Sequence, residues 1–489
     1  MLSYRFRWVY CQLESLRHCL PASVQRVLND LPDTLDETYE RVLKDINKVN
    51  QMHAIRLLHC LTVAIRPLRV EELAEVLAVD FDAARQGGIP KLNLNWRLAD
   101  HHQAVLSTCS SLIAIVNNGD SQVVQFSHFS VKEYLTSDRL ANSSGDISRY
   151  HILPDFAHTV LTQACLGVLL RLDNHITWEN AKDIPLANYA AKHWADHARF
   201  KDVSLRVQDA MDVFFDADKP HYAAYLQLHD VDDGHRWHPF TYDTNVPRAE
   251  LLYYASLYRL YDLAKHLVVK HPEHVNARGG QLVSPLGAAM YRKDFQVAEL
   301  LHEHGADANV RGNKEWTLMH LASRGGHDDT LRWLLSHGGD VNAQKDTGST
   351  ALHVATLNKD VEILQMLLEH NADIHAQNAR GEVALHLAAC HYKRHRQIET
   401  FQLLLDYGAD VNARDIEGST PLHHSSFRRR GGDVLIPGRG SVEGTRLLLE
   451  HGASMDAENN NGETPFQVAL KWGHHEMVEF LWGLGIEYP

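Results

Sequence analysis

Residues 350–388 read TALHVATLNKDVEILQMLLEHNADIHAQNARGEVALHLA, and this stretch decides the fold of the second half of the chain. Its first six residues, TALHVA at Thr350, return as VALHLA at Val383, 33 positions later, and the closing motif NADIHA begins between them at Asn371. Self-similarity at a fixed period of this length is the signature of stacked, identical supersecondary units. The stretch therefore predicts a solenoid in which each unit packs on the next.

The same unit recurs toward both ends of the chain. The third motif position is apolar in every copy and the sixth is small, which lets neighbouring units approach closely. One unit cannot bury such a face alone, so the copies must stack. Further opening motifs begin at Glu250 (ELLYYA, degenerate), Ser284 (SPLGAA), Thr317 (TLMHLA), Thr420 (TPLHHS) and Thr464 (TPFQVA), and further closing motifs at Gly305, Gly338, Gly408 and Gly452.

These motifs resemble the T-P-L-H-x-A and G-A-D-V-N-A signatures of the ankyrin family. The resemblance covers residues 249–489 and implies about seven ankyrin repeats, of which the first is degenerate. We expect the motif threonine to cap the first helix of its repeat. The resemblance also implies four histidines that bridge neighbouring backbones by hydrogen bonds: His320, His353, His386 and His423.

The first half of the chain is less periodic, but its pattern predicts a winged-helix domain. LPDTLDETYERVL places Thr34 and Glu37 at the spacing of a capping box, and further helical segments follow. SLIAIV and VVQF flank the turn sequence NNGD within residues 111–126, which predicts a β-hairpin. SVKEYL comes next, with Ser130 and Glu133 again at the spacing of a capping box. Three helices and a hairpin make a winged helix, so the expected fold class is mostly α, with winged-helix and helical domains before an ankyrin-repeat solenoid.

Several segments resemble the region after the nucleotide-binding domain of fungal NACHT–ankyrin proteins, which are STAND-type ATPases related to NOD-like receptors. They are LPDTLDETYERVL, RPLRVEELAEVL, VVQFSHFSVKEYL and PLANYAAKHWADHAR, while FRWVYCQLESLRHC looks like the last helix of the nucleotide-binding module. The resemblance implies a remnant of that module over residues 1–30, a winged-helix domain over 31–140, a helical domain over 141–216, a linker over 217–248 and ankyrin repeats over 249–489.

The phosphate-binding loop of a NACHT domain does not occur in this sequence. Such a loop ends in GK[ST], and no Gly-Lys dipeptide exists in the 489 residues. We therefore expect a truncated receptor with no nucleotide cofactor and no enzymatic activity, which is either a genuine short form or part of a longer gene product. In the related receptors the histidine that matches His128 touches the ADP phosphate, whereas here we expect it to pack at a strand–helix junction.

Composition argues against several other functions. The formal net charge of -14 disfavours binding to nucleic acid or to anionic membranes. No stretch is apolar enough to span a bilayer, the first twenty residues make a poor signal peptide, and the six cysteines lack CxxC spacing, so we expect a cytoplasmic protein. Among the 34 histidines, the best metal candidates are His391, His395 and the run 229–238, but no HExxH or zinc-finger spacing occurs, and we expect no metal site.

Three hypotheses for the function follow. The favoured one is a non-catalytic scaffold or signalling adaptor that binds a protein partner through its ankyrin repeats. The alternative is a fragment of a nucleotide-gated STAND receptor whose ATPase domain is missing from this chain or supplied in trans. A DNA-binding regulator is the weakest, because the presumed recognition region, residues 101–116, contains no Arg or Lys for phosphate contacts.

Two groups of residues are predicted to contact the partner. The motif copies at Val383, Thr420 and Thr464 are 37 and 44 residues apart instead of 33, so two repeats carry insertions. The cations of these insertions predict an acidic or phosphorylated partner. The first group lies at the hairpin fingertips and comprises Arg311, Asn313, Lys314, Gln344, Lys345, Asp346, Asn378, Arg380, Arg414 and Asp415, and the second lies in the insertions and comprises Lys393, Arg394, Arg396, Arg428, Arg429, Arg430 and Arg439.

Overall fold

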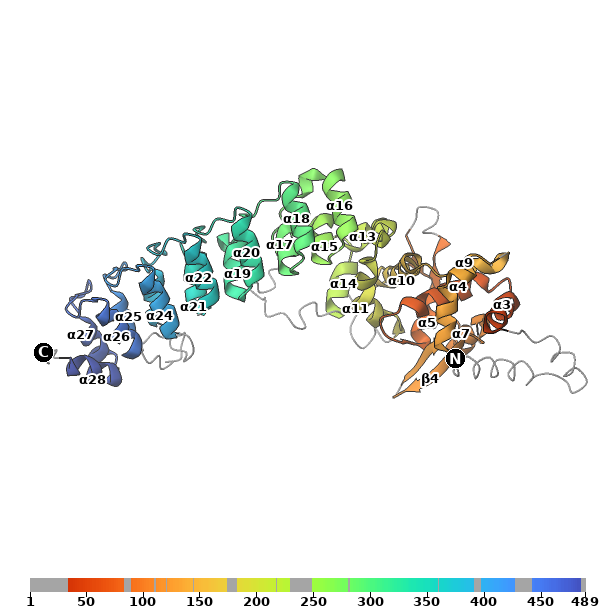
Figure 1. Cartoon of the computed structure of the whole chain (residues 1–489), viewed down its shortest axis with the longest axis horizontal. Coiled ribbons are helices and arrows are strands. Elements are labelled where there is room, and N and C mark those ends of the chain that lie inside the picture. Colours follow the sequence, from red (N-terminus) through yellow and green to blue (C-terminus); the bar gives the residue numbers. More distant parts are fainter. Residues whose placement is uncertain are drawn as a thin grey trace, which may run out of the picture. The chain divides into compact units, whose positions relative to one another are not determined.

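The computed structural model of the chain describes residues 34–82, 89–109, 111–119, 121–143, 145–173, 183–216, 218–228, 249–279, 282–358, 360–390, 397–426 and 442–484. The chain divides into two compact units, one made of residues 1–233 with 254–270 and the other of residues 234–253 with 271–489. Figure 1 shows the elements of both units. No helix in the described ranges is long and apolar enough to cross a membrane.

The first unit begins with a winged helix, as the sequence predicts. Its elements are α3 (Leu35–Asp45), α4 (Gln51–Val63), β1 (Leu68–Arg69), α5 (Val70–Val76), β2 (Val79–Asp80), β3 (Lys91–Leu92), η2 (Leu94–Trp96), α7 (His101–Cys109), β4 (Ile113–Asn118), β5 (Ser121–Phe126), α8 (Phe129–Leu135), α9 (Asp138–Ala141) and η3 (Asp146–Tyr150). The predicted capping box is confirmed, because the Glu37 N–H donates to Thr34 Oγ1 (3.1 Å) and the Thr34 N–H donates to the Glu37 carboxylate (3.3 Å). The β4–β5 hairpin turns at Gly119, whose φ is +60°, and β1 pairs with β5 to give the antiparallel order β1-β5-β4.

The second predicted capping box, at Ser130 and Glu133, is wrong. Helix α8 begins at Phe129, and its N-cap is His128, whose Nδ1 accepts a hydrogen bond from the Ser130 N–H (3.2 Å). Ser130 lies inside the first turn, where its hydroxyl contacts the Tyr39 hydroxyl (2.8 Å) and His128 Nδ1 (2.6 Å). An N-cap needs a side-chain acceptor on the residue before the helix, and an imidazole nitrogen fills that role here. The expected position of His128 at the strand–helix junction is confirmed.

The helices after the winged helix contain an aromatic cluster around Trp194, which is fully buried. They are α10 (Pro154–Leu169), α11 (Ala187–Ala198), α12 (Val203–Arg206), α13 (Gln208–Phe214), α14 (His221–Leu228), α15 (Leu251–Leu257) and α16 (Tyr261–Lys270). The Trp194 ring centroid lies 5.1 Å from that of Tyr258, and the Phe215 ring stacks on Tyr254 with centroids 4.2 Å apart. These aromatic contacts explain why most of the degenerate first repeat packs with the first unit.

Part of the predicted linker is helical. Residues 217–248 contain α14. Its Tyr225 is buried, and the Tyr225 and Phe214 rings pack edge to face with centroids 5.4 Å apart. Burial of a large aromatic side chain is favourable, so Tyr225 holds this segment against the core. The rest of the predicted linker, residues 229–248, lies outside the described residues.

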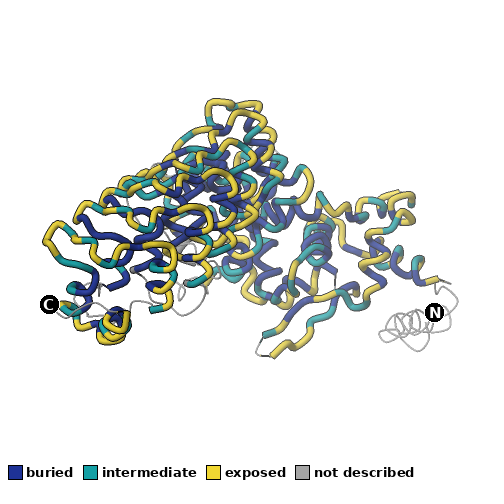
Figure 2. Tube along the Cα trace, turned by 60° about the vertical axis from the view of Figure 1, so that its left-hand side comes forward, coloured by how far each residue is buried: buried dark blue, intermediate teal, exposed yellow. Residues whose placement is uncertain are grey.

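The second unit is the predicted stack of helix pairs, which follow one another in order along the solenoid (Figure 1). Its elements are η5 (Pro272–His274), α17 (Pro285–Tyr291), α18 (Phe295–Glu303), η6 (Asn313–Glu315), α19 (Leu318–Gly325), α20 (Asp328–Ser336), α21 (Ala351–Asn358), α22 (Val361–Glu369), α23 (Ala384–Cys390), α24 (Gln397–Asp406), α25 (Pro421–Ser426), α26 (Val442–Glu450), α27 (Pro465–Lys471) and α28 (His475–Gly483). The first helices of successive repeats pack on one another from α19 through α21, α23 and α25 to α27. Figure 2 shows buried trace within these helices and exposed trace along the loops that join them.

The seam of the stack has the composition that the motif predicts. Among the described repeats, the third motif position is a buried apolar side chain, such as Leu352 and Leu385, and the sixth is a buried Ala or Ser. The predicted cap is confirmed at Thr464, whose Oγ1 accepts from the Gln467 N–H (3.4 Å), and Ser284 Oγ likewise accepts from the Gly287 N–H (3.1 Å), whereas the Thr317 hydroxyl contacts His320 Nδ1 (2.8 Å). Local capping and seam packing therefore specify the same helix starts.

Four histidines form a row that ties consecutive repeats together, and we call it the histidine row. In each, Nδ1 accepts from the backbone N–H of the first motif residue and the Nε2–H donates to a carbonyl of the next repeat, at 2.9–3.0 Å. Burial lowers the pKa of all four imidazoles, to about 4 for His320 and His386. The bridging role is confirmed for His320 (Thr317 N–H, Ser349 carbonyl), His353 (Thr350, Glu382), His386 (Val383, Ser419) and His423 (Thr420, Glu463).

Candidate partner-binding surface

The tips of the hairpin loops form a continuous row along the stack. Each tip is joined to the next by one backbone hydrogen bond, of 2.8–3.1 Å. These bonds run from Asp346 N–H to the Lys314 carbonyl, from Ala379 to Thr347, from Ile416 to Arg380 and from Asn460 to Glu417. A partner therefore meets loops that are already in register, which lowers the entropic cost of binding.

Several predicted contact residues are exposed on this loop row. Arg311 donates to the Gln344 carbonyl (3.0 Å) and pairs with Glu315 (3.2 Å), so its guanidinium lies across two loops. Lys345 is half-buried, and the side chain of Asn313 lies outside the described part of the structure. The exposed residues are Arg311, Lys314, Gln344, Asp346, Arg380 and Arg414.

Three of the predicted residues shape the loops. The Asp415 side chain is 6% exposed, and its carboxylate accepts from His424 Nε2 (2.7 Å) and from two backbone N–H groups of its own loop. Asn378 Oδ1 likewise accepts from two N–H groups of its loop, and the Arg414 guanidinium donates to carbonyls of its own loop and the next. These bonds give Asp415, Asn378 and Arg414 a role in holding the loops together.

Two cations lie over the ring of Trp316, and two more, Arg311 and Lys314, belong to the loop that precedes it. We call Trp316, Arg311, Lys314, Arg324 and Lys345 the Trp316 patch. Lys345 Nζ lies 4.5 Å and the Arg324 guanidinium carbon 5.5 Å from the Trp316 ring centroid. Burial lowers the pKa of Lys345 and, although Asp346 raises it, repulsion from Arg324 and Lys314 lowers it further. These residues therefore gather positive charge that a bound anion would stabilise.

A cleft of about 510 Å³ opens between the last described loops of the stack, and we call it the acidic cleft. Its carboxylates outnumber its Arg and Lys side chains, and Glu463 pairs with Lys471 while Glu417 is exposed. Ile416, which is 64% exposed, and Trp472 add apolar surface. Its charged lining consists of Glu382, Asp415, Glu417, Glu463, Arg380 and Lys471, with His423 and His424 beside them. An acidic segment would meet repulsion here.

The cations of the two insertions cannot be placed on either surface. Lys393, Arg394, Arg396, Arg428, Arg429, Arg430 and Arg439 lie outside the described residues. The metal candidates His391 and His395 and the run 229–238 lie outside them as well.

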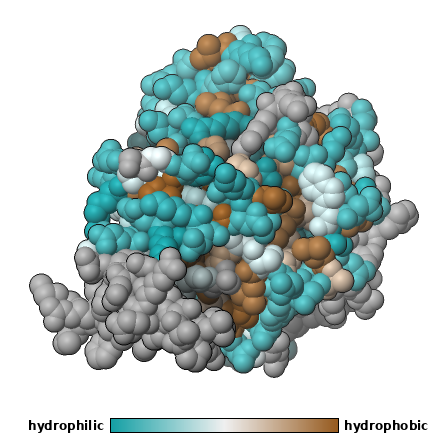
Figure 3. Space-filling view, turned by 90° about the vertical axis from the view of Figure 1, so that its right-hand side faces the viewer, coloured by the Kyte–Doolittle hydropathy of each residue, from teal (hydrophilic) through white to brown (hydrophobic). Residues whose placement is uncertain are grey.

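A hollow of about 450 Å³ in the first unit offers a different chemistry. It is lined mainly by apolar side chains, including Met52, Leu153 and Phe156, all of which are exposed. His59 at its wall is buried, and burial lowers the pKa of its imidazole to about 4, so it is neutral at physiological pH. Figure 3 shows hydrophobic patches between hydrophilic areas on the face that it draws. Its polar lining consists of His59, Arg149 and His151, and none of the described lining residues is a carboxylate, serine or cysteine.

Comparison with known proteins agrees with this architecture. Models of ankyrin repeats match residues 251–345, 286–378, 387–436 and 434–481, and the model "GPI inositol-deacylase, winged helix domain" matches residues 39–146. A curated relative from Monascus ruber, "Azaphilone pigments biosynthesis cluster protein L", is 30% identical over 297 residues, which are 57% of this chain and 61% of the relative. The match thus spans less than two thirds of that relative. The chain carries a winged-helix domain similar to that of GPI inositol-deacylases followed by ankyrin repeats, which indicate a role in protein–protein interaction.

Proposed function

We propose that the chain is a non-catalytic adaptor, and that an acidic or phosphorylated segment of its protein partner lies on the Trp316 patch. The observation that carries this proposal is the placement of two cations over one half-buried indole on the loop row. Ankyrin loops in fixed register offer the surrounding contact area. Phosphate and carboxylate groups are the natural ligands of clustered Arg and Lys side chains.

Each of these charged contacts contributes only a small free energy to binding. A cation–π contact at an exposed site stabilises by about 0.5–1 kcal/mol, and an exposed ion pair by about 0.2–1 kcal/mol. The charge on the patch therefore steers the approach of the partner and favours a segment of negative charge. Burial of Trp316 and its neighbours must supply most of the affinity. The surplus of carboxylates in the acidic cleft supports a location of the acidic segment at the Trp316 patch and not at the far end of the loop row.

A peptide-display selection on the immobilised full chain tests the proposed chemistry. Selected peptides should be enriched in Asp and Glu, and phosphopeptides should compete with them. Lys314→Glu and Trp316→Ala should each abolish the enrichment. Arg332→Glu is the matched control, because Arg332 is an exposed cation on α20 rather than on the loop row. Enrichment of basic peptides, or acidic enrichment that survives in both patch variants, would overturn the proposal.

A second proposal keeps the nucleotide-gated receptor as the alternative function. It is supported by the winged-helix match and by His128 at the N-terminus of α8, where the resemblance implies a phosphate contact. Under our favoured proposal, isothermal titration of the chain with ATP and magnesium should give no binding tighter than about millimolar, because the sequence has no phosphate-binding loop. A micromolar heat signature that His128→Ala removes would favour the receptor instead.

A further inference from the structure

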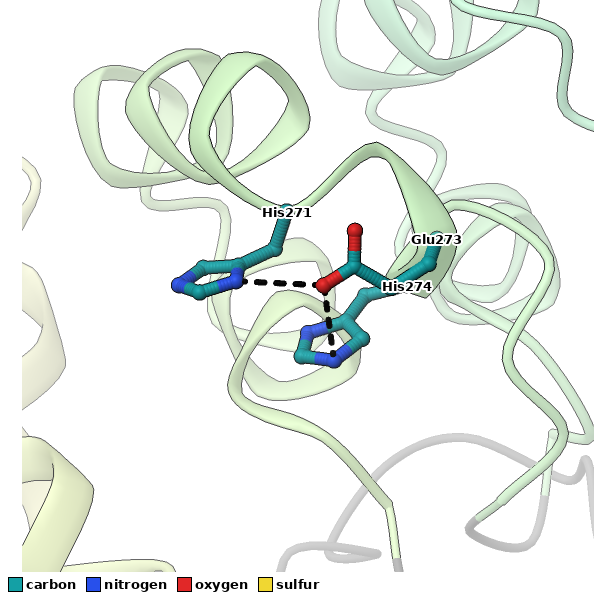
Figure 4. Close-up of side chains that lie close together, drawn as sticks. All are labelled: His271, Glu273 and His274. Carbon is teal, nitrogen blue, oxygen red and sulfur yellow. Dashed lines mark hydrogen bonds and ion pairs between the residues drawn. The ribbon is translucent and has the colours of Figure 1, made fainter.

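A turn of the second unit brings three metal-binding side chains together. His271, Glu273 and His274 lie in or beside η5, and their donor atoms are all within 4.8 Å of one another. Nδ1 of His271 lies 3.3 Å, and Nε2 of His274 lies 3.7 Å, from Oε1 of Glu273. Figure 4 shows the two imidazoles approaching that oxygen from different sides.

These distances are close to those of a tetrahedral metal site. Bonds of about 2.0–2.2 Å from a zinc ion to nitrogen or oxygen place neighbouring ligand atoms about 3.3–3.6 Å apart at the tetrahedral angle. Both distances to Glu273 therefore need only small side-chain rotations to accept an ion. Pro272, at the start of η5, fixes the backbone between His271 and Glu273, so less entropy is lost when the ligands converge.

We propose that His271, Glu273 and His274 bind a divalent transition-metal ion of the zinc class. Two imidazoles and one carboxylate match the ligand preference of this class, and a fourth position remains for water or for a group of another molecule. The histidine side chains are 37% and 27% exposed, so an ion reaches them directly from solvent.

This site has no known signature in the sequence because its ligands have unusual spacing. H-P-E-H places them at positions i, i+2 and i+3, which neither an HExxH helix nor a zinc finger uses. A tight 3₁₀ turn, in which residues three apart eclipse one another, brings these positions to one side. Among the described residues, no other group of three such side chains converges in this way.

The chain contains a matched control for the proposed site. Glu299, His302 and His337 have the same side-chain types in the same unit, and His337 Nε2 lies 3.2 Å from the Glu299 carboxylate. The His302 and His337 rings are perpendicular, however, and His337 Nδ1 donates to the Trp333 carbonyl (2.8 Å). This set therefore has the composition of a metal site without the convergence of its donor atoms.

Zinc chloride titrated into the purified full chain, followed by calorimetry, tests the proposal. The wild type should bind one equivalent of zinc with a higher affinity than the other histidines of the chain provide. His271→Ala/His274→Ala should lower the affinity for that equivalent about tenfold or more. Glu273→Gln should weaken it without removing a histidine, while His302→Ala/His337→Ala should leave it unchanged. Cobalt should give the visible absorption of a tetrahedral ion in the wild type and in His302→Ala/His337→Ala, but not in His271→Ala/His274→Ala. Equal zinc binding by the wild type and the His271/His274 variant, with both equally folded by thermal melting, would overturn the proposal.

Discussion

The histidine row makes the stability of the ankyrin stack depend on pH. Protonation would turn Nδ1 from an acceptor into a donor that faces the backbone N–H it now binds, so the folded stack holds these imidazoles neutral. The unfolded chain takes up protons near the ordinary histidine pKa of about 6.5, whereas His320 and His386 in the folded stack do so near 4. Their contribution is therefore complete above about pH 6.5 and is lost as the pH falls from there toward 4.

The size of the effect follows from the same pKa values. Between pH 7 and pH 5, a shift from 6.5 to about 4 removes about 2 kcal/mol of unfolding free energy for each histidine, hence about 4 kcal/mol for His320 and His386 together. His353 and His423 add to this loss, because their pKa values are lowered too. This loss is a large fraction of the stability of a typical domain.

Urea unfolding of the full chain at several pH values, read by pulsed hydrogen exchange and mass spectrometry, measures this loss. Peptides from α19 to α25 report on the stack alone, which matters because burial also lowers the pKa of His158 and His197 in the first unit. The double variant His320→Gln/His386→Gln should be less stable at pH 7 but lose much less stability on going to pH 5. His375→Gln, at an exposed histidine outside the row, should behave like the wild type. Equal pH dependence in the wild type and the double variant would refute the reasoning.

Two further predictions concern packing. Gly381 and Gly462 both have φ +72°, but a Cβ at Gly381 would lie 2.8 Å from the Ile416 backbone nitrogen, whereas one at Gly462 would meet nothing within 4 Å. Gly381→Ala should therefore cost about 1–3 kcal/mol more than Gly462→Ala in urea unfolding of the stack, and equal costs would mean that the loops are not held together as described. Trp194→Ala should destabilise the first unit by about 3–5 kcal/mol and reduce amide protection in α15, whose Tyr254 stacks on Phe215 in the same aromatic cluster, whereas unchanged exchange in α15 would contradict this coupling.

The ankyrin stack and the winged helix could be predicted because their signals are local or periodic. The row formed by His320, His353, His386 and His423 follows from one motif position repeated at a fixed period, and the Thr34 cap follows from a spacing of three residues. No local or periodic signal marks α14, because Tyr225 is buried against rings from other segments, those of Phe214 and of the more distant Tyr258. The cap of α8 was misassigned because Ser130 and Glu133 satisfy the capping pattern two residues after the true N-cap, His128.

The candidate site was predicted less completely, for a physical reason. The sequence identifies which loops form the tips, but it does not tell which of their side chains form hydrogen bonds with backbone groups. Asp415 and Lys345 look equivalent as charged tip residues, yet one is saturated by His424 and backbone N–H groups while the other lies over Trp316. The pairing of Trp316 with Lys345 joins two repeats, so it exists only after stacking. The cluster at His271 was missed because it depends on a 3₁₀ turn.

Affinity purification from the native host with the wild-type chain and with Lys314→Glu/Lys345→Glu, at equal expression, tests the central claim most directly. The account predicts at least one protein that the wild type and Arg332→Glu retain and the patch variant loses. The purified pair should bind directly, and its Kd should rise steeply with salt because steering by the patch is electrostatic. Retention of every bound protein by the patch variant at wild-type levels would contradict the assignment of the loop row as the partner-binding surface.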